Sequence, residues 1–376
     1  MITFVFIITG IYAILILSFS VGFKKVSVFK SQKKYSKNSF SIVIPFRNEA
    51  ENLQPLLDSI KNLKFTRSQY ECIFIDDDSI DDSVNIIHQN LDKTDIQYSV
   101  IPNFRKSNSP KKDAINSAIK LAKYDWIITT DADCVVPQYW LCQFNEFSEQ
   151  NNSKMIVGPV MYLSTNFSFL ESFQLLDFLS LQGATLGGFG IKKPFLCNGA
   201  NLAYKKDAFI ALKGFHGNEE IASGDDIFLF EKFYKKNPTE VHFLKSKAAI
   251  VKTKPVSTWS ELIQQRMRWA AKSSSYNLKT GKIVGIIVLL TNVVFIISMI
   301  EIFSSHENSL SFLYCLIIKI LLDFILIKQT SLYYIGSSKK IRYFELGSLF
   351  YPFFSIYIVL KTITGKYSWK GRIFKK

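Results

Sequence analysis

An apolar segment without any charged residue, Ile2–Phe23, most constrains what this chain can form. A helix over this segment is long enough to cross the hydrocarbon core of a bilayer. No basic region precedes it and lysines follow it, so residues 1–23 are predicted to be a transmembrane anchor and not a cleaved signal peptide. Because basic residues favour the cytoplasmic side, we expect the N-terminus outside and the following domain in the cytoplasm.

Further apolar runs lie near the other end of the chain. Ile283–Ile300 is a second candidate for crossing the membrane, and Leu310–Ile327 is a third that contains Lys319 and Asp323. These two charges are four residues apart, so they can pair on one face of a helix. A charge pair inside an apolar run also leaves a transport role open.

The last apolar run, Leu346–Leu360, differs from the others because Pro352 lies in its middle. At about 1.5 Å per residue it reaches only about 22 Å, whereas the hydrocarbon core is about 30 Å thick. Proline also removes a helical hydrogen bond and favours a kink. We therefore predict a C-terminal membrane region over 281–363, with two spanning helices and a kinked or re-entrant segment that returns the basic tail, 364–376, to the cytoplasm.

The charge of the chain points to an anionic partner. Basic residues outnumber acidic ones by 46 to 31, and the excess is concentrated in two stretches without acids, 24–37 and 361–376. Since both stretches lie beside apolar runs, they are typical of the cytoplasmic side of a multi-pass protein of the cell membrane. We expect a lipid membrane and no nucleic acid as partners, with 24–39 as a basic linker. The five cysteines lack CxxC spacing, which predicts free thiols in a reducing compartment.

The middle of the chain, from residue 40 to about 136, alternates short apolar runs with amphipathic stretches of helical spacing. The predicted strands are 41–45, 72–75, 97–101 and 126–129. This alternation predicts an α/β fold with a parallel sheet and helices on its faces. Ligands of such sheets bind beyond the C-terminal ends of the strands, where several charged clusters of this chain fall.

Two of these clusters are carboxylates that directly follow predicted strands. Asp76, Asp77 and Asp78 would repel one another unless cations or donors relieve them, and carboxylates there can accept hydrogen bonds from a uracil or a ribose. Asp131 and Asp133 are spaced by one residue and can both face a hard divalent ion such as Mg²⁺ or Mn²⁺. A solvated turn remains the alternative for the first cluster, and a DxD pair alone is common by chance.

A third cluster, Ser223-Gly224-Asp225-Asp226, precedes an apolar run with the pattern of a helix. One acid could do no more than stabilise the helix N-terminus. The other could be a general base that takes the proton of an acceptor hydroxyl.

A fourth cluster, Gln265–Trp269, lies in a basic amphipathic segment ahead of the second spanning candidate. Arg268 can bind a diphosphate through its planar guanidinium, and Trp269 can stack on a sugar. Both residue types are also common anchors at membrane interfaces, so this alternative stays open.

In this order, DDDS at Asp76–Ser79, DAD at Asp131–Asp133, GDD at Gly224–Asp226 and QRMRW at Gln265–Trp269 resemble the motifs of family 2 glycosyltransferases. The likeness is to the membrane-bound branch that includes cellulose, hyaluronan and poly-N-acetylglucosamine synthases and glycolipid-forming enzymes. It implies a cytoplasmic GT-A domain over 40–275, a Rossmann-like fold that binds a nucleotide-sugar, with flanking transmembrane helices. Such a chain resembles an inverting, metal-dependent hexosyltransferase with a nucleotide-diphosphate sugar, expected to be a UDP-sugar, as donor.

The resemblance also implies a role for individual residues. Asp226 falls on the catalytic aspartate of the family, and Asp131 and Asp133 fall on the pair that holds Mg²⁺ or Mn²⁺. The implied nucleotide-binding residues are Pro45, Arg47, Glu49, Asp76, Asp77, Lys111, Asn116 and Asp131. The residues implied to contact the diphosphate or the acceptor are Asp225, Gln265, Arg268 and Trp269.

Two departures from the family pattern leave the acceptor open. The usual TED motif reads GDD, and Leu196–Asn201 lacks the wording usual in synthases. The few apolar segments leave little material for a polymer channel, so we expect a lipid or lipid-linked glycan as acceptor. Within the GT-A domain, the segments near 167–195 and 258–275 are expected to lie at the membrane interface. A processive polysaccharide synthase is the alternative, and a non-catalytic membrane scaffold or a transporter is the alternative from another class.

Overall fold

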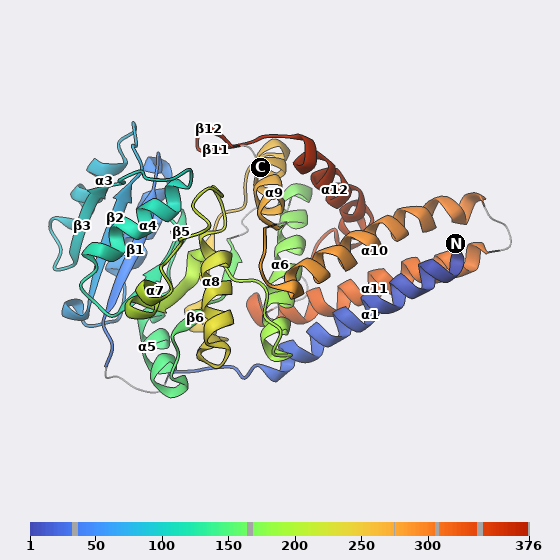
Figure 1. The fold of residues 1–376 in the computed structure, drawn as a ribbon, viewed down its shortest axis with the longest axis horizontal. Coiled ribbons are helices and arrows are strands. Elements are labelled where there is room, and N and C mark those ends of the chain that lie inside the picture. The colour runs from blue at the N-terminus through green and yellow to red at the C-terminus, as the bar shows by residue number, and fades with distance from the viewer. Residues whose placement is uncertain (32–36, 164–167, 274, 305–307, 337–340, 375–376) are drawn as a thin grey trace. The chain divides into compact units, whose positions relative to one another are not determined.

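The computed structural model describes residues 1–374 except 32–36, 164–167, 274, 305–307 and 337–340 (Figure 1). Two compact units divide the chain. The sheet unit comprises Ser27–Leu163 and Cys197–Lys254; the helical unit comprises Met1–Val26, Ser164–Leu196 and Pro255–Lys376. Some basic residues of the predicted linker and tail fall outside the described residues: Lys33, Lys34, Lys375 and Lys376.

A seven-stranded sheet in the order β3-β2-β1-β4-β8-β6-β9 forms the centre of the sheet unit (Figure 1). Its strands are β1 (Phe40–Phe46), β2 (Tyr70–Asp76), β3 (Gln97–Pro102), β4 (Trp126–Thr129), β6 (Met155–Val157), β8 (Leu202–Lys205) and β9 (Val241–Phe243). β1 pairs in parallel with β2 and β4, and β2 pairs in parallel with β3, so the predicted parallel sheet is confirmed here. β8 runs antiparallel to β4 and β6, which makes the other half of the sheet mixed.

The central strands of this sheet are buried on both faces. Ile42, Val43 and Ile44 of β1 and Phe74 of β2 are inaccessible to solvent, which explains why these strands read as continuous apolar runs. The helices of the unit are α2 (Ala50–Lys61), α3 (Ser83–Leu91), α4 (Pro110–Leu121), α5 (Trp140–Asn151), α7 (Lys206–Ala211) and α8 (Asp225–Lys236). A second sheet has three strands, in the order β5 (Cys134–Val135), β10 (Val251–Thr253), β7 (Val160–Tyr162).

Four described helices of the helical unit are long and apolar enough to cross a membrane. They are α1 (Ile2–Lys25), α10 (Lys279–Ser304), α11 (Ser309–Tyr334) and α12 (Phe344–Thr364). α1, α10 and α11 pack against one another and run side by side in Figure 1. α6 (Phe169–Gly190) packs on α1 and α11, and α9 (Trp259–Ser273) packs on α12. The three predicted spanning segments therefore all form helices, while the interfacial placement of α6 and α9 stays a prediction.

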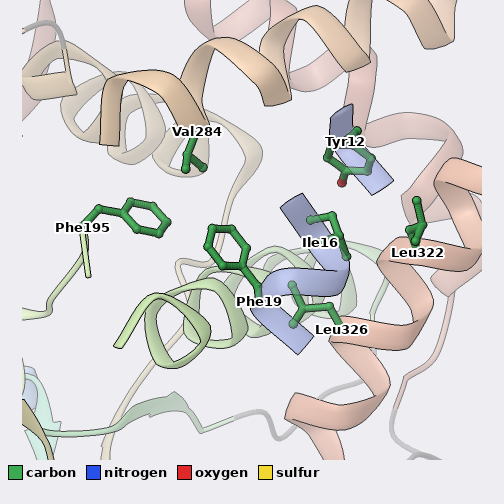
Figure 2. Packing of buried hydrophobic residues seen from close by; sticks show 7 residues of the cluster. All are labelled: Tyr12, Ile16, Phe19, Phe195, Val284, Leu322 and Leu326. Carbon is green, nitrogen blue, oxygen red and sulfur yellow. The ribbon is translucent and has the colours of Figure 1, made fainter. Parts of the chain in front are cut away.

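The predicted charge pair within α11 is confirmed. Lys319 Nζ lies 2.8 Å from a carboxylate oxygen of Asp323, and the hydroxyl of Tyr12 in α1 donates a hydrogen bond to the same carboxylate. Around this polar contact the helices pack through apolar side chains. Figure 2 shows this cluster, which consists of Tyr12, Ile16, Phe19, Phe195, Val284, Leu322 and Leu326.

Glycines bring the backbones of α1 and α6 into direct contact. A Cβ atom added to Gly187 would lie 2.6 Å from the carbonyl oxygen of Phe19, and one added to Gly190 would lie 1.8 Å from that of Gly22. Both clashes are with backbone atoms, which cannot turn aside as a side chain can. Small residues that permit such close approach are typical of helix pairs in membranes.

This contact predicts that Gly187→Ala destabilises the folded protein. The added methyl group would force α1 away from α6, and overpacking of this kind costs about 1–3 kcal/mol. Thermal unfolding in detergent would show the loss as a lower Tm. Gly10→Ala is the matched control, because a Cβ there meets no atom within 4 Å; an equal drop in both variants would contradict the explanation.

The last apolar run, Leu346–Leu360, lies within a single helix, α12, which continues through Pro352. Whether this segment is kinked or re-entrant in a membrane stays a prediction. A proline in a helix frees the carbonyl four residues earlier, but neighbouring helices make this tolerable in an apolar environment. α12 has such neighbours in α9, α10 and α6.

The C-terminal tail folds back onto α9. β11 (Tyr367–Trp369) and β12 (Arg372–Phe374) form an antiparallel hairpin, whose turn residues Lys370 and Gly371 both have positive φ angles. A turn of this kind matches the twist of the strands it joins. The backbone N–H of Ser368 donates to Gln264 of α9 at 2.8 Å. The tail and α9 therefore lie at the same end of the helical unit.

Candidate active site

The loop after β1 and the loop after β2 hold each other in place. Asn48 has a φ angle of 50°, and its side-chain oxygen accepts from the backbone N–H of Ile80 at 2.9 Å, while its own N–H donates to Ser79 Oγ at 3.0 Å. Arg47 donates to the carbonyl oxygens of Asp77 and Asp78. Pro45 lies in β1 and Glu49 precedes α2. Five of the predicted nucleotide-binding residues are thus gathered at one edge of the sheet: Pro45, Arg47, Glu49, Asp76 and Asp77.

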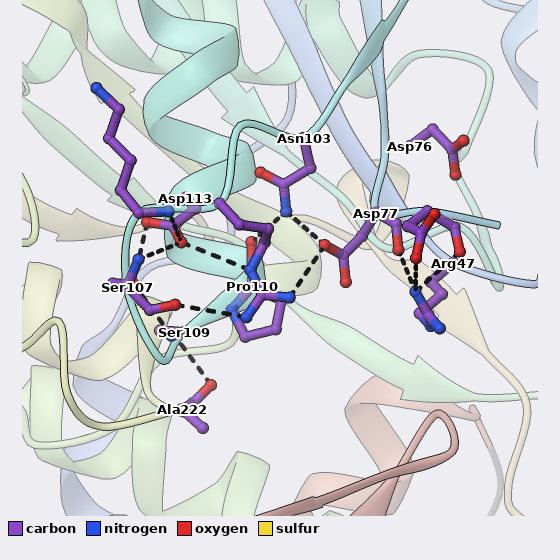
Figure 3. Close-up of polar contacts among 12 residues, drawn as sticks. Arg47, Asp76, Asp77, Asn103, Ser107, Ser109, Pro110, Asp113 and Ala222 are labelled. Atoms are coloured by element: carbon purple, nitrogen blue, oxygen red, sulfur yellow. Dashed lines mark hydrogen bonds and ion pairs between the residues drawn. The ribbon is translucent and has the colours of Figure 1, made fainter.

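The carboxylates at the end of β2 have donors that relieve their mutual repulsion. The carboxylate of Asp76 accepts from the N–H of Ser79 at 2.9 Å. The carboxylate of Asp77 accepts from the side-chain amide of Asn103 at 2.7 Å, and a guanidinium nitrogen of Arg105 lies 3.6 Å from the same carboxylate (Figure 3). The alternative of a solvated turn does not describe Asp77, which is only 6% exposed.

The carboxylates of the DAD motif form a group that fits a hard divalent ion. Ligand atoms of Asp131, Asp133 and Cys134 all lie within 4.8 Å of one another. Oxygen ligands suit Mg²⁺ or Mn²⁺. Burial and the two nearby carboxylates raise the pKa of the Cys134 thiol, so it stays neutral and is a poor ligand for such an ion. The two aspartates are therefore the side chains of this group that could hold a metal.

Lys111, in the first turn of α4, connects two of the motifs. Its Nζ lies 2.6 Å from a carboxylate oxygen of Asp131 and 3.2 Å from one of Asp225. Burial acts to lower the pKa of Lys111, but the two carboxylates outweigh it and raise the pKa well above its usual range. The lysine is therefore a permanent cation between the DAD and GDD motifs.

The GDD motif begins α8. Gly224 has a φ angle of +85°, a conformation that suits glycine, and the two aspartates form the first turn of the helix. The carboxylate of Asp226 accepts from its neighbour Ile227 N–H at 2.7 Å and from Gly199 N–H at 3.3 Å. The partial positive charge of the helix N-terminus stabilises both carboxylates.

Two residues that sequence reasoning missed support this arrangement. Gly199 lies so close to the motifs that an added Cβ would be 3.1 Å from Asp225 and 3.3 Å from Asp226. Lys112 is 1% exposed and its Nζ donates to the carbonyl oxygens of Asn218 and Ile221, at 2.6 and 2.7 Å. The sequence signals that could have found them were the segment Leu196–Asn201, which differs from the usual family wording, and the second lysine beside Lys111. Neither signal indicates such contacts by itself.

The remaining predicted site residues lie elsewhere. Asn116 of α4 is near Gly214, whose added Cβ would be 3.3 Å from its Oδ1. Gln265, Arg268 and Trp269 lie on α9 in the helical unit, and their role at the diphosphate or acceptor stays a prediction.

Arg266, two residues before Arg268, makes a contact that the sequence did not predict. The buried Arg266 donates to Asp177 of α6 at 2.6 Å, and its guanidinium lies 4.1 Å from the ring centre of Trp269. Arg266 thus ties α9 to α6.

Comparisons with known proteins bear on the family and the fold of this chain. Residues 41–212 match the family model described as Glycosyl transferase family 2. The chain is 34% identical over 120 residues to the poly(ribitol-phosphate) beta-glucosyltransferase of Bacillus spizizenii; the aligned region is 32% of this chain and 19% of that protein. It is 25% identical over 242 residues to the probable glycosyltransferase YdaM of Bacillus subtilis, which covers 64% and 56%. It is 27% identical over 139 residues to the poly-beta-1,6-N-acetyl-D-glucosamine synthase of Staphylococcus aureus, which covers 36% and 32%.

These alignments span less than two thirds of each relative's length. Among solved structures, the mannosyltransferase PcManGT from Pyrobaculum calidifontis, in complex with GDP-Man and Mn²⁺, superposes with a TM-score of 0.57 at 12% identity and covers 96% of both chains. At that identity the likeness supports the fold alone. Family match and fold lead to the same conclusion: residues 41–212 resemble the family 2 glycosyltransferases, and the fold is that of a GT-A glycosyltransferase.

Proposed function

We propose that this enzyme moves a sugar from a nucleotide-diphosphate sugar, with UDP as the nucleotide, onto a lipid or lipid-linked glycan at the cytoplasmic face of the cell membrane. The observation that carries the proposal is the group of charges around Lys111, which joins Asp131 of DAD to Asp225 of GDD. Lys111 balances carboxylates that would otherwise repel a diphosphate. Asp133 lies beside Asp131 after the parallel strand β4, at the edge where ligands of such sheets bind, and Asp226 follows Asp225 at the start of α8.

The nucleotide end of the donor belongs at the loops after β1 and β2. Asp76 and Asp77 carry acceptor oxygens there for a uracil or a ribose, and Asn103 and Arg105 hold Asp77 in its orientation. Arg47 fixes the loop by binding its carbonyl oxygens. These contacts pre-organise the site before the donor binds.

The transfer itself is a single displacement. Asp226 accepts the proton of an acceptor hydroxyl while that oxygen attacks the anomeric carbon, and the electron pair of the breaking C–O bond leaves with the nucleoside diphosphate. A Mg²⁺ or Mn²⁺ ion on Asp131 and Asp133 would supply positive charge for this leaving group. One displacement inverts the anomeric carbon and needs no second nucleophile.

The experiment that tests the proposal presents detergent-solubilised enzyme with radiolabelled UDP- and GDP-sugars and total membrane lipid. We expect label from one UDP-sugar to enter the lipid fraction, with the new linkage opposite in configuration to that of the donor. Retention of configuration, or transfer from no donor, would contradict the proposal. A product of many sugars would instead favour the processive alternative.

We infer that α1, α10 and α11 each cross the membrane once, whereas α12 begins and ends on the cytoplasmic side. If α10 and α11 both cross, α9 and the start of α12 lie on the same side. A crossing α12 would then carry Ser368 away from Gln264, although the two are hydrogen-bonded. α12 would therefore lie along the membrane surface, which returns the basic tail to the cytoplasm.

A cysteine placed at Ser368 tests this topology in a variant that lacks the native cysteines. In intact cells we expect an impermeant thiol reagent to leave Ser368→Cys unlabelled, and to label it after lysis. Asn308→Cys, at the start of α11, is the matched control that should be labelled from outside. External labelling of Ser368→Cys would show that α12 crosses.

A further inference from the structure

A cavity of about 310 Å³ lies inside the helical unit, between α1, α6, α10, α11 and α12. Ligand pockets of proteins typically measure about 300–1,000 Å³. Most of its lining is apolar, and six of the side chains in Figure 2 form part of it: Tyr12, Ile16, Phe19, Phe195, Val284 and Leu326. An apolar wall of this size between apolar helices suits a hydrocarbon chain.

The polar groups on the wall are carboxylates and hydroxyls. The carboxylates belong to Asp177 and Asp323. The hydroxyls belong to Tyr12, Ser180, Ser273, Tyr276, Ser348, Tyr351 and Ser355. Among the described lining residues there is no lysine, arginine or histidine. The cations that pair with the two carboxylates, Arg266 and Lys319, are not part of the lining.

This arrangement of charge discriminates between classes of lipid. The carboxylates of Asp177 and Asp323 are already paired with Arg266 and Lys319, so a phosphate group in the cavity would find no free cation on the described wall, and an unpaired charge is costly in an apolar site. A lipid hydroxyl can instead donate to a carboxylate, which accepts only. Each carboxylate has further lone pairs beside those that its protein partners use, and the wall hydroxyls add more donors and acceptors. The wall therefore matches a lipid with an apolar chain, free hydroxyl groups and no charge.

We propose that this cavity binds one chain of an uncharged, hydroxyl-bearing lipid of the acylglycerol type, and that this lipid is the acceptor. The assignment as acceptor rests on the proposed function, whereas the binding site rests on the cavity. The carboxylates accept hydrogen bonds from the headgroup hydroxyls, and the apolar wall holds the chain.

Gly285 gives a direct way to fill the cavity. It lies on the wall, and a Cβ added to it would meet no atom within 4 Å, so Gly285→Phe places a ring where the chain would lie without a backbone clash. Gly10→Phe is the matched control: Gly10 also has no atom within 4 Å of an added Cβ, but it does not line the cavity. Both substitutions add the same apolar ring to a long apolar helix.

The experiment uses the full chain in phosphatidylcholine nanodiscs and a diacylglycerol with a diazirine in one acyl chain. We expect photolabelling of peptides from the cavity wall in the wild type and in Gly10→Phe. Labelling should fall by about tenfold or more in Gly285→Phe, since the ring displaces several methylenes and each is worth roughly fourfold in affinity. Unlabelled dioleoylglycerol should compete, and dioleoyl phosphatidic acid should not.

Equal labelling of Gly285→Phe and the wild type would overturn the proposed site, and equal competition by phosphatidic acid would overturn the choice of an uncharged lipid. Sugar transfer to dioleoylglycerol and UDP binding are measured on the same samples. Loss of transfer with intact UDP binding in Gly285→Phe supports the acceptor role. Normal labelling in an enzyme that transfers no sugar supports the lipid site and overturns the acceptor role together with the proposed function.

Discussion

Replacing Asp226 with asparagine is expected to lower turnover by about 10²–10⁴-fold, the usual value of general-base help. The carboxylate stands at the N-terminus of α8, where it accepts from the N–H groups of Gly199 and Ile227. Asparagine preserves the size of the side chain and one acceptor oxygen, but it does not take up the proton of the attacking hydroxyl. UDP binding should stay near that of the wild type, because the nucleotide contacts that we propose lie in the loops after β1 and β2. Steady-state kinetics and UDP titration of the purified variant measure the two effects separately.

Asp207→Asn provides the matched control for this variant. Asp207 is an exposed aspartate in the first turn of α7, in the same unit of the chain. It shares the helix N-terminal position with Asp226 but not the neighbouring motifs, so its turnover should be unchanged. Wild-type turnover in Asp226→Asn would remove this residue from the mechanism, and an equal loss in both variants would point to folding instead of chemistry.

Removal of divalent cations is expected to abolish activity, and Mn²⁺ or Mg²⁺ should restore it. The expectation follows from the hard oxygen ligands that Asp131 and Asp133 bring within 4.8 Å of each other. Asp133→Asn should raise the Mn²⁺ concentration needed for half-maximal activity, because an amide oxygen carries no negative charge. Assays of chelated enzyme against increasing Mn²⁺ would measure this, and full activity after thorough chelation would contradict it.

Cys134→Ala separates the carboxylates from the thiol in the same group. Because burial raises the pKa of Cys134, the thiol stays neutral at assay pH and should contribute nothing to Mn²⁺ binding. The Mn²⁺ dependence of this variant should therefore match that of the wild type. A large shift would mean that the thiol is a ligand and that a softer metal occupies the site.

The topology of the helical unit shows where sequence patterns are reliable and where they are not. Apolar runs long enough to cross a bilayer leave a helix as the only way to satisfy their backbone groups, which is why α1, α10 and α11 could be placed in advance. The structure of Leu346–Leu360 was ambiguous from the sequence, because Pro352 and the short length of the segment argue for a break in the helix. Packing of α12 against α9 and α10 offsets the lost hydrogen bond, and that packing depends on contacts distant in sequence.

The sequence by itself determined the strands around β1 and their parallel pairing, the three long apolar helices and the order of the four motifs. These features follow from local periodicity, since buried strands and membrane helices must be apolar over known lengths. Only the tertiary structure decided which charges meet. Lys111 joins Asp131 to Asp225, which is distant in sequence, and Arg266 takes Asp177 as its partner. Such pairs depend on which helix packs against which strand or helix, and no local pattern in the chain contains that information.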